Sequence, residues 1–135
     1  MATRSSILEK TPTGYRGIYC HWDGYLENNG LILHQHYQDP DKVRRLIDLG
    51  SLSELRERVE PIGPHSYDTP EKGTTIAYHR DRGEKYRAPS EGQTIQEASA
   101  SLGHNGHIYV FEDGKWTYNG QDLAQCLNGT ADQEP

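Results

Sequence analysis

The pattern of apolar and polar residues predicts a strand across residues 15–25, which read YRGIYCHWDGY. The side chains of a strand alternate between its two sides. One side of this strand is apolar and carries Ile18, Cys20 and Trp22. The other side presents groups that a partner could contact, namely Tyr19, His21 and Asp23. Asp23-Gly24 then provides the left-handed backbone angles of a tight hairpin turn, so the strand should reverse there.

The residues on either side of this strand carry weaker signals. Residues 1–14 are polar and lack a period, which predicts a flexible lead-in. Asn28-Asn29-Gly30 is a second turn signal. The segment 31–37 fits a buried strand or a short helix, and the spacing of Leu33 and Tyr37 favours the helix.

The clearest helix signal begins at Asp39-Pro40. Asp39 is a good N-cap acceptor, and the φ angle of proline is already helical. We therefore expect a helix through Leu49 that ends at Gly50. Its inner stripe consists of Val43, Leu46 and Ile47.

Two capping-box patterns predict further short helices. Ser51 and Glu54 predict a helix that ends before Pro61. Thr94 and Glu97 predict another that runs from residue 95 to residue 103. The apolar residues that this last helix should bury are Ile95, Ala98 and Leu102.

The segments between these helices include a loop and a strand. Residues 61–73 contain three prolines and two glycines, which predicts an exposed connection. Residues 74–79 alternate as in a strand, and they lead into a charged turn at residues 80–84. Residues 122–127 fit one or two helical turns, and residues 128–135 should form a flexible tail.

Near the end of the chain, a β-hairpin is indicated by two short apolar runs. Residues 108–112 and 115–118 flank Asp113-Gly114, which is a two-residue turn signal. The turn places three pairs of side chains opposite each other: Glu112 with Lys115, Phe111 with Trp116, and Tyr109 with Tyr118. One ion pair and two aromatic pairs therefore fall into register together.

These elements predict the fold class. Residues 15–127 should form a single α+β domain, in which a small antiparallel sheet is packed with three short helices. The strands of this sheet are the opening strand, the strand at residues 74–79 and the closing hairpin.

Composition qualifies this picture. The chain has 135 residues, a net charge of −6, nine tyrosines and two tryptophans. The negative charge and the few aliphatic residues are typical of disorder, but the aromatic rings can bury large areas, so we expect a small aromatic-rich core. An acidic chain without a Lys or Arg cluster is not expected to bind nucleic acid directly. The alternative use of such a surface is mimicry of nucleic acid.

Two further features bear on the cellular compartment. Cys20 and Cys126 lie far apart, and no apolar signal segment opens the chain, which predicts reduced thiols in the cytoplasm. No window approaches the roughly 18 apolar residues that a membrane span requires.

Several motifs resemble those of a family of small proteins from tailed bacteriophages and prophages. That family shares a CHWDGY-like opening, here residues 20–25, and an RDRGE-like turn, here residues 80–84. Residues 109–116 (YVFEDGKW) are also similar, so the resemblance extends from about residue 15 to residue 118. Leu26 departs from the pattern, because relatives often carry proline there.

This resemblance implies a phage setting, in which small acidic accessory proteins act on the host, including its antiviral defences. The leading hypothesis is a non-enzymatic protein without a cofactor that binds and inhibits or sequesters a host factor, either a protein or a small nucleotide signal. The expected contact residues are Tyr19, His21, Asp23, Tyr25, Tyr78, Arg80 and Arg82.

Arg80 and Arg82 would project together if the strand from residue 74 continued through them. Their guanidinium groups could then bind a phosphate or a carboxylate, and Tyr78 on the same side could stack on a base. The simpler interpretation is internal pairing of these arginines with Asp81 and Glu84.

The alternative from another functional class is a small metal-assisted phosphodiester hydrolase. Four potential ligands lie within sixteen residues, namely His21, Asp23, His34 and His36. Arg80 or Arg82 would hold the phosphate. The spacing matches no established zinc pattern, and surface histidines are the simpler interpretation.

Cys20 is a candidate nucleophile because it stands beside His21. Adjacent residues of a strand face opposite ways, which disfavours a direct pair. A small buried core residue is the simpler interpretation of Cys20.

Overall fold

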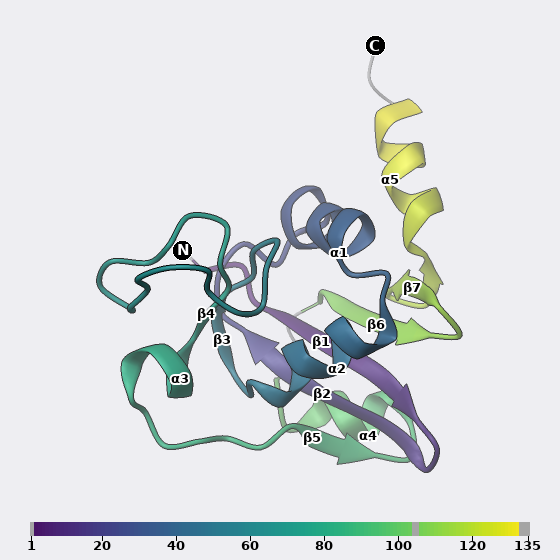
Figure 1. Ribbon diagram of the computed structural model, residues 1–135. Coiled ribbons are helices and arrows are strands. Elements are labelled where there is room, and N and C mark those ends of the chain that lie inside the picture. Colours follow the sequence, from purple (N-terminus) through teal and green to yellow (C-terminus); the bar gives the residue numbers. More distant parts are fainter. Residues whose placement is uncertain (1, 104–105, 133–135) are drawn as a thin grey trace.

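The strand β1 lies at the centre of the structure, which is a computed structural model that describes residues 2–103 and 106–132 (Figure 1). β1 (Ser5–Thr11) pairs antiparallel with β2 (Gly14–Cys20) and parallel with β6 (Ile108–Glu112). The prediction of a flexible lead-in over residues 1–14 is therefore wrong. The pattern was obscured because the strand contains Ser5, Ser6 and Glu9, which are buried although they are polar.

The remaining strands extend this mixed sheet in the order β4-β3-β2-β1-β6-β7-β8. β3 (Leu52–Glu54) pairs parallel with β2, and β4 (Ile76–Ala77) pairs antiparallel with β3. β7 (Lys115–Tyr118) and β8 (Gln121–Asp122) extend the other edge, and β5 (Ser90–Gly92) pairs with the first residues of β2. The sheet is mixed rather than antiparallel, because β1 contacts β6 and β2 contacts β3 in parallel.

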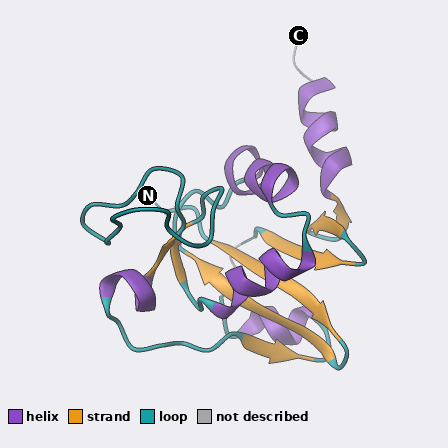
Figure 2. Ribbon diagram, viewed as in Figure 1, coloured by secondary structure: helices purple, strands orange, loops and turns teal. Residues whose placement is uncertain are grey.

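Helices lie on both faces of the sheet (Figure 2). A five-residue π-helix (Leu26–Gly30) leads directly into α1 (Leu31–His36), and α2 (Pro40–Asp48) follows. The other helices are α3 (Tyr78–Arg82), α4 (Ile95–Ala100) and α5 (Leu123–Asp132). The α+β class is confirmed, although the described residues form five α-helices rather than three.

Two predicted helices begin at the expected caps. Asp39 accepts a hydrogen bond from the backbone N–H of Asp41, and Thr94 accepts one from the backbone N–H of Glu97. The predicted stripe of α2, which is Val43, Leu46 and Ile47, is fully buried. In α4 only Ala98 of the three predicted apolar residues is fully buried. The short helix over 31–36 is also confirmed.

The predicted helix after Ser51 is wrong, because this segment is the strand β3. The carbonyl of Leu52 accepts a hydrogen bond from the N–H of His21 at 3.0 Å, and that of Ser53 accepts one from Trp22 at 3.0 Å. Pairing with β2 therefore outweighs the local capping signal, which acts only within a few residues.

Both turn signals after β2 were also misinterpreted. Asp23 does adopt a left-handed angle, with a φ of 55°. However, Gly24 then binds the carbonyl of Thr3, and the chain enters the π-helix that includes Asn28 to Gly30. The hairpin involving β2 is formed with the preceding strand instead.

The closing hairpin has the predicted register. Tyr109 lies opposite Tyr118, Phe111 opposite Trp116, and Glu112 opposite Lys115. Asp113 and Gly114 both have positive φ angles, of 54° and 75°, as a two-residue hairpin turn requires. After it, α5 continues through Asp132, so residues 128–132 are helical rather than part of a flexible tail; residues 133–135 lie outside the described residues.

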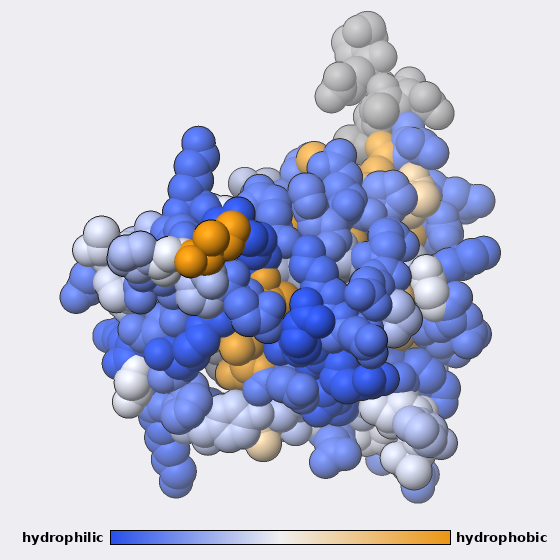
Figure 3. All heavy atoms as spheres, viewed as in Figure 1, coloured by the Kyte–Doolittle hydropathy of each residue, from blue (hydrophilic) through white to orange (hydrophobic). Residues whose placement is uncertain are grey.

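The sheet separates two apolar clusters. Ile7, Ile18 and Tyr109 belong to the larger cluster, which also contains the buried residues of α1 and α2. Leu8 and Val110 belong to the smaller cluster with Ala98 of α4. The surface outside them is largely hydrophilic on the face shown in Figure 3. Among the described helices, none is long and apolar enough to cross a membrane.

Candidate functional site

A groove beside the end of β2 brings together two of the predicted contact residues, Tyr19 and Tyr78. It consists of two adjoining cavities of about 340 Å³ and about 150 Å³, which share Tyr19, Ser51 and Arg87. We call this feature the Tyr19 groove. The larger cavity is also lined by Gly17, Ile18, Ala88, Ser90, Ser101 and Leu102. The smaller one is also lined by Tyr78, His79, Glu84 and Lys85.

Segments that lie far apart in the sequence form this groove. Tyr19 comes from β2, Ser51 immediately precedes β3, and Tyr78 is the first residue of α3. The irregular segment 84–89 passes beside them between α3 and β5 (Figure 1). The groove therefore exists only when β2, β3 and this segment are assembled.

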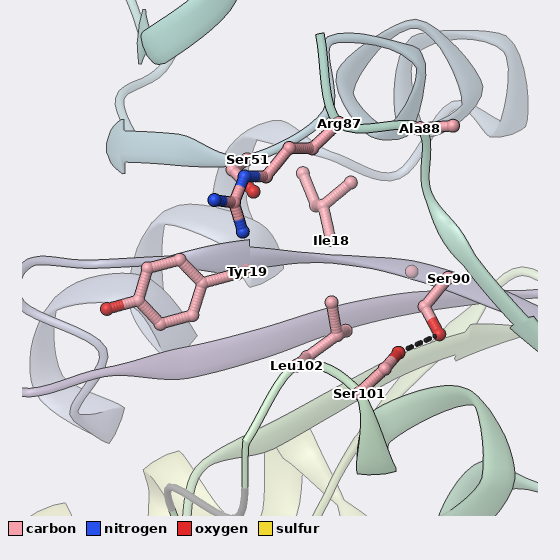
Figure 4. Close-up of a pocket in the computed structure, with 9 residues that line it drawn as sticks. Ile18, Tyr19, Ser51, Arg87, Ala88, Ser90, Ser101 and Leu102 are labelled. Atoms are coloured by element: carbon pink, nitrogen blue, oxygen red, sulfur yellow. Dashed lines mark hydrogen bonds between the residues drawn. The ribbon is translucent and has the colours of Figure 1, made fainter. Parts of the chain in front are cut away.

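The position of Arg87 depends on a close backbone approach at Gly50. Gly50 has a φ of 79°, and a Cβ atom at this position would lie only 2.5 Å from the carbonyl oxygen of Arg87. The hydroxyl of Tyr86 donates to the carbonyl of Asp48 at 2.8 Å and secures the same segment. These contacts place the guanidinium of Arg87 over Ser51 and toward Tyr19 (Figure 4).

The charge in the groove is positive although the whole chain is acidic. Lys85 and Arg87 are cations, and the carboxylate of Glu84 lies 3.3 Å from the guanidinium of Arg82. Among the side chains that the structure describes, no carboxylate forms an ion pair with Arg87 or Lys85. Both cations are therefore available to an anionic ligand.

Hydroxyl groups complete the polar lining. Ser90 and Ser101 share a hydrogen bond of 2.6 Å at the far end of the larger cavity (Figure 4). Burial raises the pKa of Tyr19, and the nearby charge of Arg4 acts in the opposite direction. Burial also raises the pKa of Tyr78. The two phenols are thus neutral hydrogen-bonding groups at neutral pH.

Tyr19, His21 and Trp22 form an aromatic cluster next to the groove. The Tyr19 hydroxyl and Nδ1 of His21 share a hydrogen bond of 2.6 Å, and the rings of His21 and Trp22 meet edge to face with centroids 4.6 Å apart. Trp22 is 41% exposed, so the prediction that it points inward with Ile18 and Cys20 is wrong. The strand ends at Cys20, and strict alternation ends with it.

Asp23 and Tyr25 do not line the groove. Asp23 is half-buried in the bend after β2, where its carbonyl accepts a hydrogen bond from the side chain of Asn28 at 3.1 Å. Tyr25 is exposed at the start of the π-helix. The predicted contact face is therefore divided between the groove and the exposed surface that follows it.

Arg80 and Arg82 do not project together, because residues 78–82 form the helix α3 instead of continuing the strand. Arg80 points inward and donates to the carbonyl oxygens of Val59 and Thr75, each at 2.6 Å. Arg82 lies over the ring of Tyr67, 4.9 Å from its centroid, and pairs with Glu84. Internal pairing, the simpler interpretation of the sequence, accounts for both arginines.

The four candidate metal ligands do not converge. Among the described residues, no three His, Cys, Asp or Glu side chains are close enough together to hold a metal ion. His21 is bonded to Tyr19, whereas His34 and His36 belong to α1. The quartet that would carry a metal-assisted hydrolase is thus not brought together.

Cys20 is a core residue, which confirms the simpler interpretation of the sequence. It is fully buried, and burial raises the pKa of its thiol to about 11. The amide of Asn29 lies 3.6 Å from the sulfur. A nucleophilic thiolate is therefore disfavoured at this position.

Among the groove residues that sequence reasoning missed are Ser51, Lys85 and Arg87. Residues 84–89 have no period and no capping pattern, so nothing local indicates that they lie against β2. The one available signal was a pair of cations, Lys85 and Arg87, spaced two apart near tyrosines. That signal is common on protein surfaces.

Comparisons with known proteins add no assignment. No protein-family model matches this chain, and neither the curated proteins nor the solved structures that were searched include a match. The resemblance to a phage family thus stays a prediction that rests on the motifs alone.

Proposed function

We propose that this chain is a phage or prophage accessory protein that acts without catalysis in the host cytoplasm. It binds a host factor that belongs to antiviral defence and inhibits or sequesters it. The phage setting rests on the resemblance of residues 20–25 and 80–84 to the family motifs. The mode of action rests on the Tyr19 groove.

The observation that carries the proposal is the placement of Arg87. Its guanidinium enters a solvent-open groove and has no carboxylate partner among the described side chains. Arg80, by contrast, is partly buried and uses its donors within the protein, whereas Arg87 is exposed to solvent. Arg87 instead offers a planar set of donors to an anionic group of a partner.

The aromatic cluster supports the same conclusion. Trp22 and Tyr25 are each 41% exposed, and they follow the strand that supplies Tyr19. Exposed Trp and Tyr, together with Arg, are the residue types that most often dominate binding energies at interfaces. An arginine without an ion-pair partner in the groove, together with exposed aromatic rings on the segment that follows β2, is therefore suited to holding a partner.

The proposal is tested by capture followed by titration. Tagged protein is incubated with extract of the bacterial host, and the retained proteins and small molecules are identified by mass spectrometry. The identified factor is then titrated calorimetrically against the purified chain. We expect saturation at a fixed molar ratio, with the factor recovered chemically unchanged.

A matched pair of variants ties the result to the groove. Arg87→Glu should weaken binding at least about tenfold, because it replaces a donor of charged hydrogen bonds with a repulsive carboxylate. Arg44→Glu makes the same charge change on the exposed face of α2, where Arg44 pairs with Asp41, and it should leave binding within about twofold. Turnover of the factor, or binding that never saturates, would contradict the proposal.

A further inference from the structure

We propose that the ligand of the Tyr19 groove is a mononucleotide, whose phosphate binds Arg87 and Lys85 and whose base packs against tyrosine. This inference rests on the proposed function, since it names the chemical class of the factor that is held. It uses the volume, the charge and the aromatic lining of the groove.

The volume of the groove fits a small molecule. The two cavities, of about 340 Å³ and about 150 Å³, adjoin at Tyr19, Ser51 and Arg87. Small-molecule sites usually begin at about 300 Å³. A ligand that contacts Lys85 and Tyr78 in the smaller cavity would pass beside Arg87 and extend into the larger one.

The charge of the groove matches a phosphate monoester. Lys85 and Arg87 contribute two positive charges, and the one carboxylate in the lining, Glu84, is paired with Arg82. A phosphate monoester carries between one and two negative charges at neutral pH. Its oxygens match the planar donors of a guanidinium, and the hydroxyl of Ser51 lies beneath Arg87 to donate another bond (Figure 4).

The aromatic lining distinguishes a nucleotide from a simple phosphate. Tyr19 and Tyr78 both line the smaller cavity, next to the two cations. Tyr78 is itself backed by Tyr67, with ring centroids 6.2 Å apart and an angle of 30° between the planes, and the guanidinium of Arg82 covers Tyr67. This backing holds the Tyr78 ring in place. A fixed aromatic ring provides a surface on which a base stacks with little loss of side-chain entropy.

The test is isothermal titration of the full chain with defined probes. These are the four 5′-mononucleotides AMP, GMP, CMP and UMP, cyclic AMP and cyclic GMP, together with adenosine and inorganic phosphate. We expect at least one nucleotide to bind at a 1:1 ratio. We expect adenosine and phosphate each to bind at least about tenfold more weakly, because each makes only part of the contacts.

Variants show which side chain binds the phosphate and which binds the base. Arg87→Gln should weaken the binding of both the nucleotide and phosphate at least about tenfold. Arg44→Gln, on the exposed face of α2, should change neither affinity by more than about twofold. Tyr78→Leu should weaken the binding of the nucleotide but leave the binding of phosphate unchanged. The unchanged phosphate affinity also shows that this variant remains folded.

Several outcomes would overturn the inference. One is the failure of all six nucleotides to bind at millimolar concentration, and another is equal loss of affinity in Arg87→Gln and Arg44→Gln. If a host protein still binds the chain in a saturable complex while no nucleotide does, the inference fails and the proposed function stands. If a nucleotide binds but is converted to a product, the proposed function fails and the ligand class stands.

Discussion

Arg80 and Asp81, which are neighbours in the sequence, form a two-point ion pair in α3. Nε of Arg80 lies 2.8 Å from Oδ1 of Asp81, and Nη2 lies 3.0 Å from Oδ2. Burial raises the pKa of Asp81, but hydrogen bonds from Arg80 and from the N–H of Ala77, together with Nε2 of His65 at 3.1 Å, outweigh it and leave the pKa below its usual value. The pair therefore fastens α3 to β4 and to the loop that precedes it.

The first prediction follows from this pair. Arg80→Ala should lower the free energy of unfolding by about 2–4 kcal/mol, because it removes the paired cation from the buried Asp81 carboxylate and a donor from each of two backbone carbonyls. Arg82→Ala should lower it by less than about 0.5 kcal/mol, since the Arg82 side chain is 53% exposed. Urea denaturation followed by circular dichroism measures both. Equal effects of the two substitutions would show that the inward contacts of Arg80 do not stabilise the fold.

The closing hairpin gives a second prediction. Trp116 is buried, packs on Phe111 and donates from Nε1 to the carbonyl of Tyr37 at 2.7 Å. Trp116→Ala should destabilise the protein by about 3–5 kcal/mol through the cavity it creates. Lys115→Ala, at the exposed neighbouring position, should change stability by less than about 0.5 kcal/mol. Denaturation midpoints of the two variants provide the comparison, and a stable Trp116→Ala protein would contradict this packing.

The third prediction concerns pH. Glu71 accepts hydrogen bonds from the hydroxyl of Thr74 and from the N–H groups of Ile62 and Gly63, and these bonds lower its pKa to about 2. Because the folded pKa lies below the unfolded value of about 4.3, the carboxylate stabilises the fold above that value. This contribution is lost as the pH falls from about 4.3 toward 2.

Glu71→Gln is the variant that measures the stabilisation provided by the Glu71 carboxylate. The melting temperature of the wild-type protein should exceed that of Glu71→Gln at pH 7, and the difference should shrink as the pH is lowered through this window. Glu91→Gln, an exposed change of the same kind on β5, should show no such convergence. A difference that stays constant from pH 7 to pH 2 would mean that the Glu71 charge does not hold the 61–73 loop.

The fourth prediction concerns the two thiols. Cys20 is fully buried and its pKa is raised by burial to about 11, whereas Cys126 is partly exposed on α5. Iodoacetamide at pH 8 should therefore modify the native protein once, at Cys126, and the urea-denatured protein twice. Mass spectrometry counts the adducts, and Cys126→Ser should remain unmodified in the native state. Rapid alkylation of Cys20 in that variant would contradict its burial.

The sequence by itself determined the elements whose signals are local. The register of the hairpin from 108 to 118 follows from Asp113-Gly114, and the starts of α2 and α4 follow from the caps Asp39 and Thr94. In each case the decisive hydrogen bonds or turn angles involve residues within a few positions of one another. The apolar stripe of α2 and the burial of Cys20 follow from local periodicity in the same way.

Only the tertiary structure decided which segments form the centre of the sheet and the groove. β1 is central because it pairs with β2 and β6, and its buried Glu9 is compensated by Arg16 at 2.6 Å. β3 is a strand although its local pattern predicts a helix, because its pairing with β2 outweighs the capping signal. α3 is a helix although its local pattern predicts a continued strand, and in this helix Arg80 points inward. Arg87 reaches Tyr19 across 68 positions of sequence, and only a close approach at Gly50 places it there. Such contacts depend on where distant segments meet, which no short window of sequence encodes.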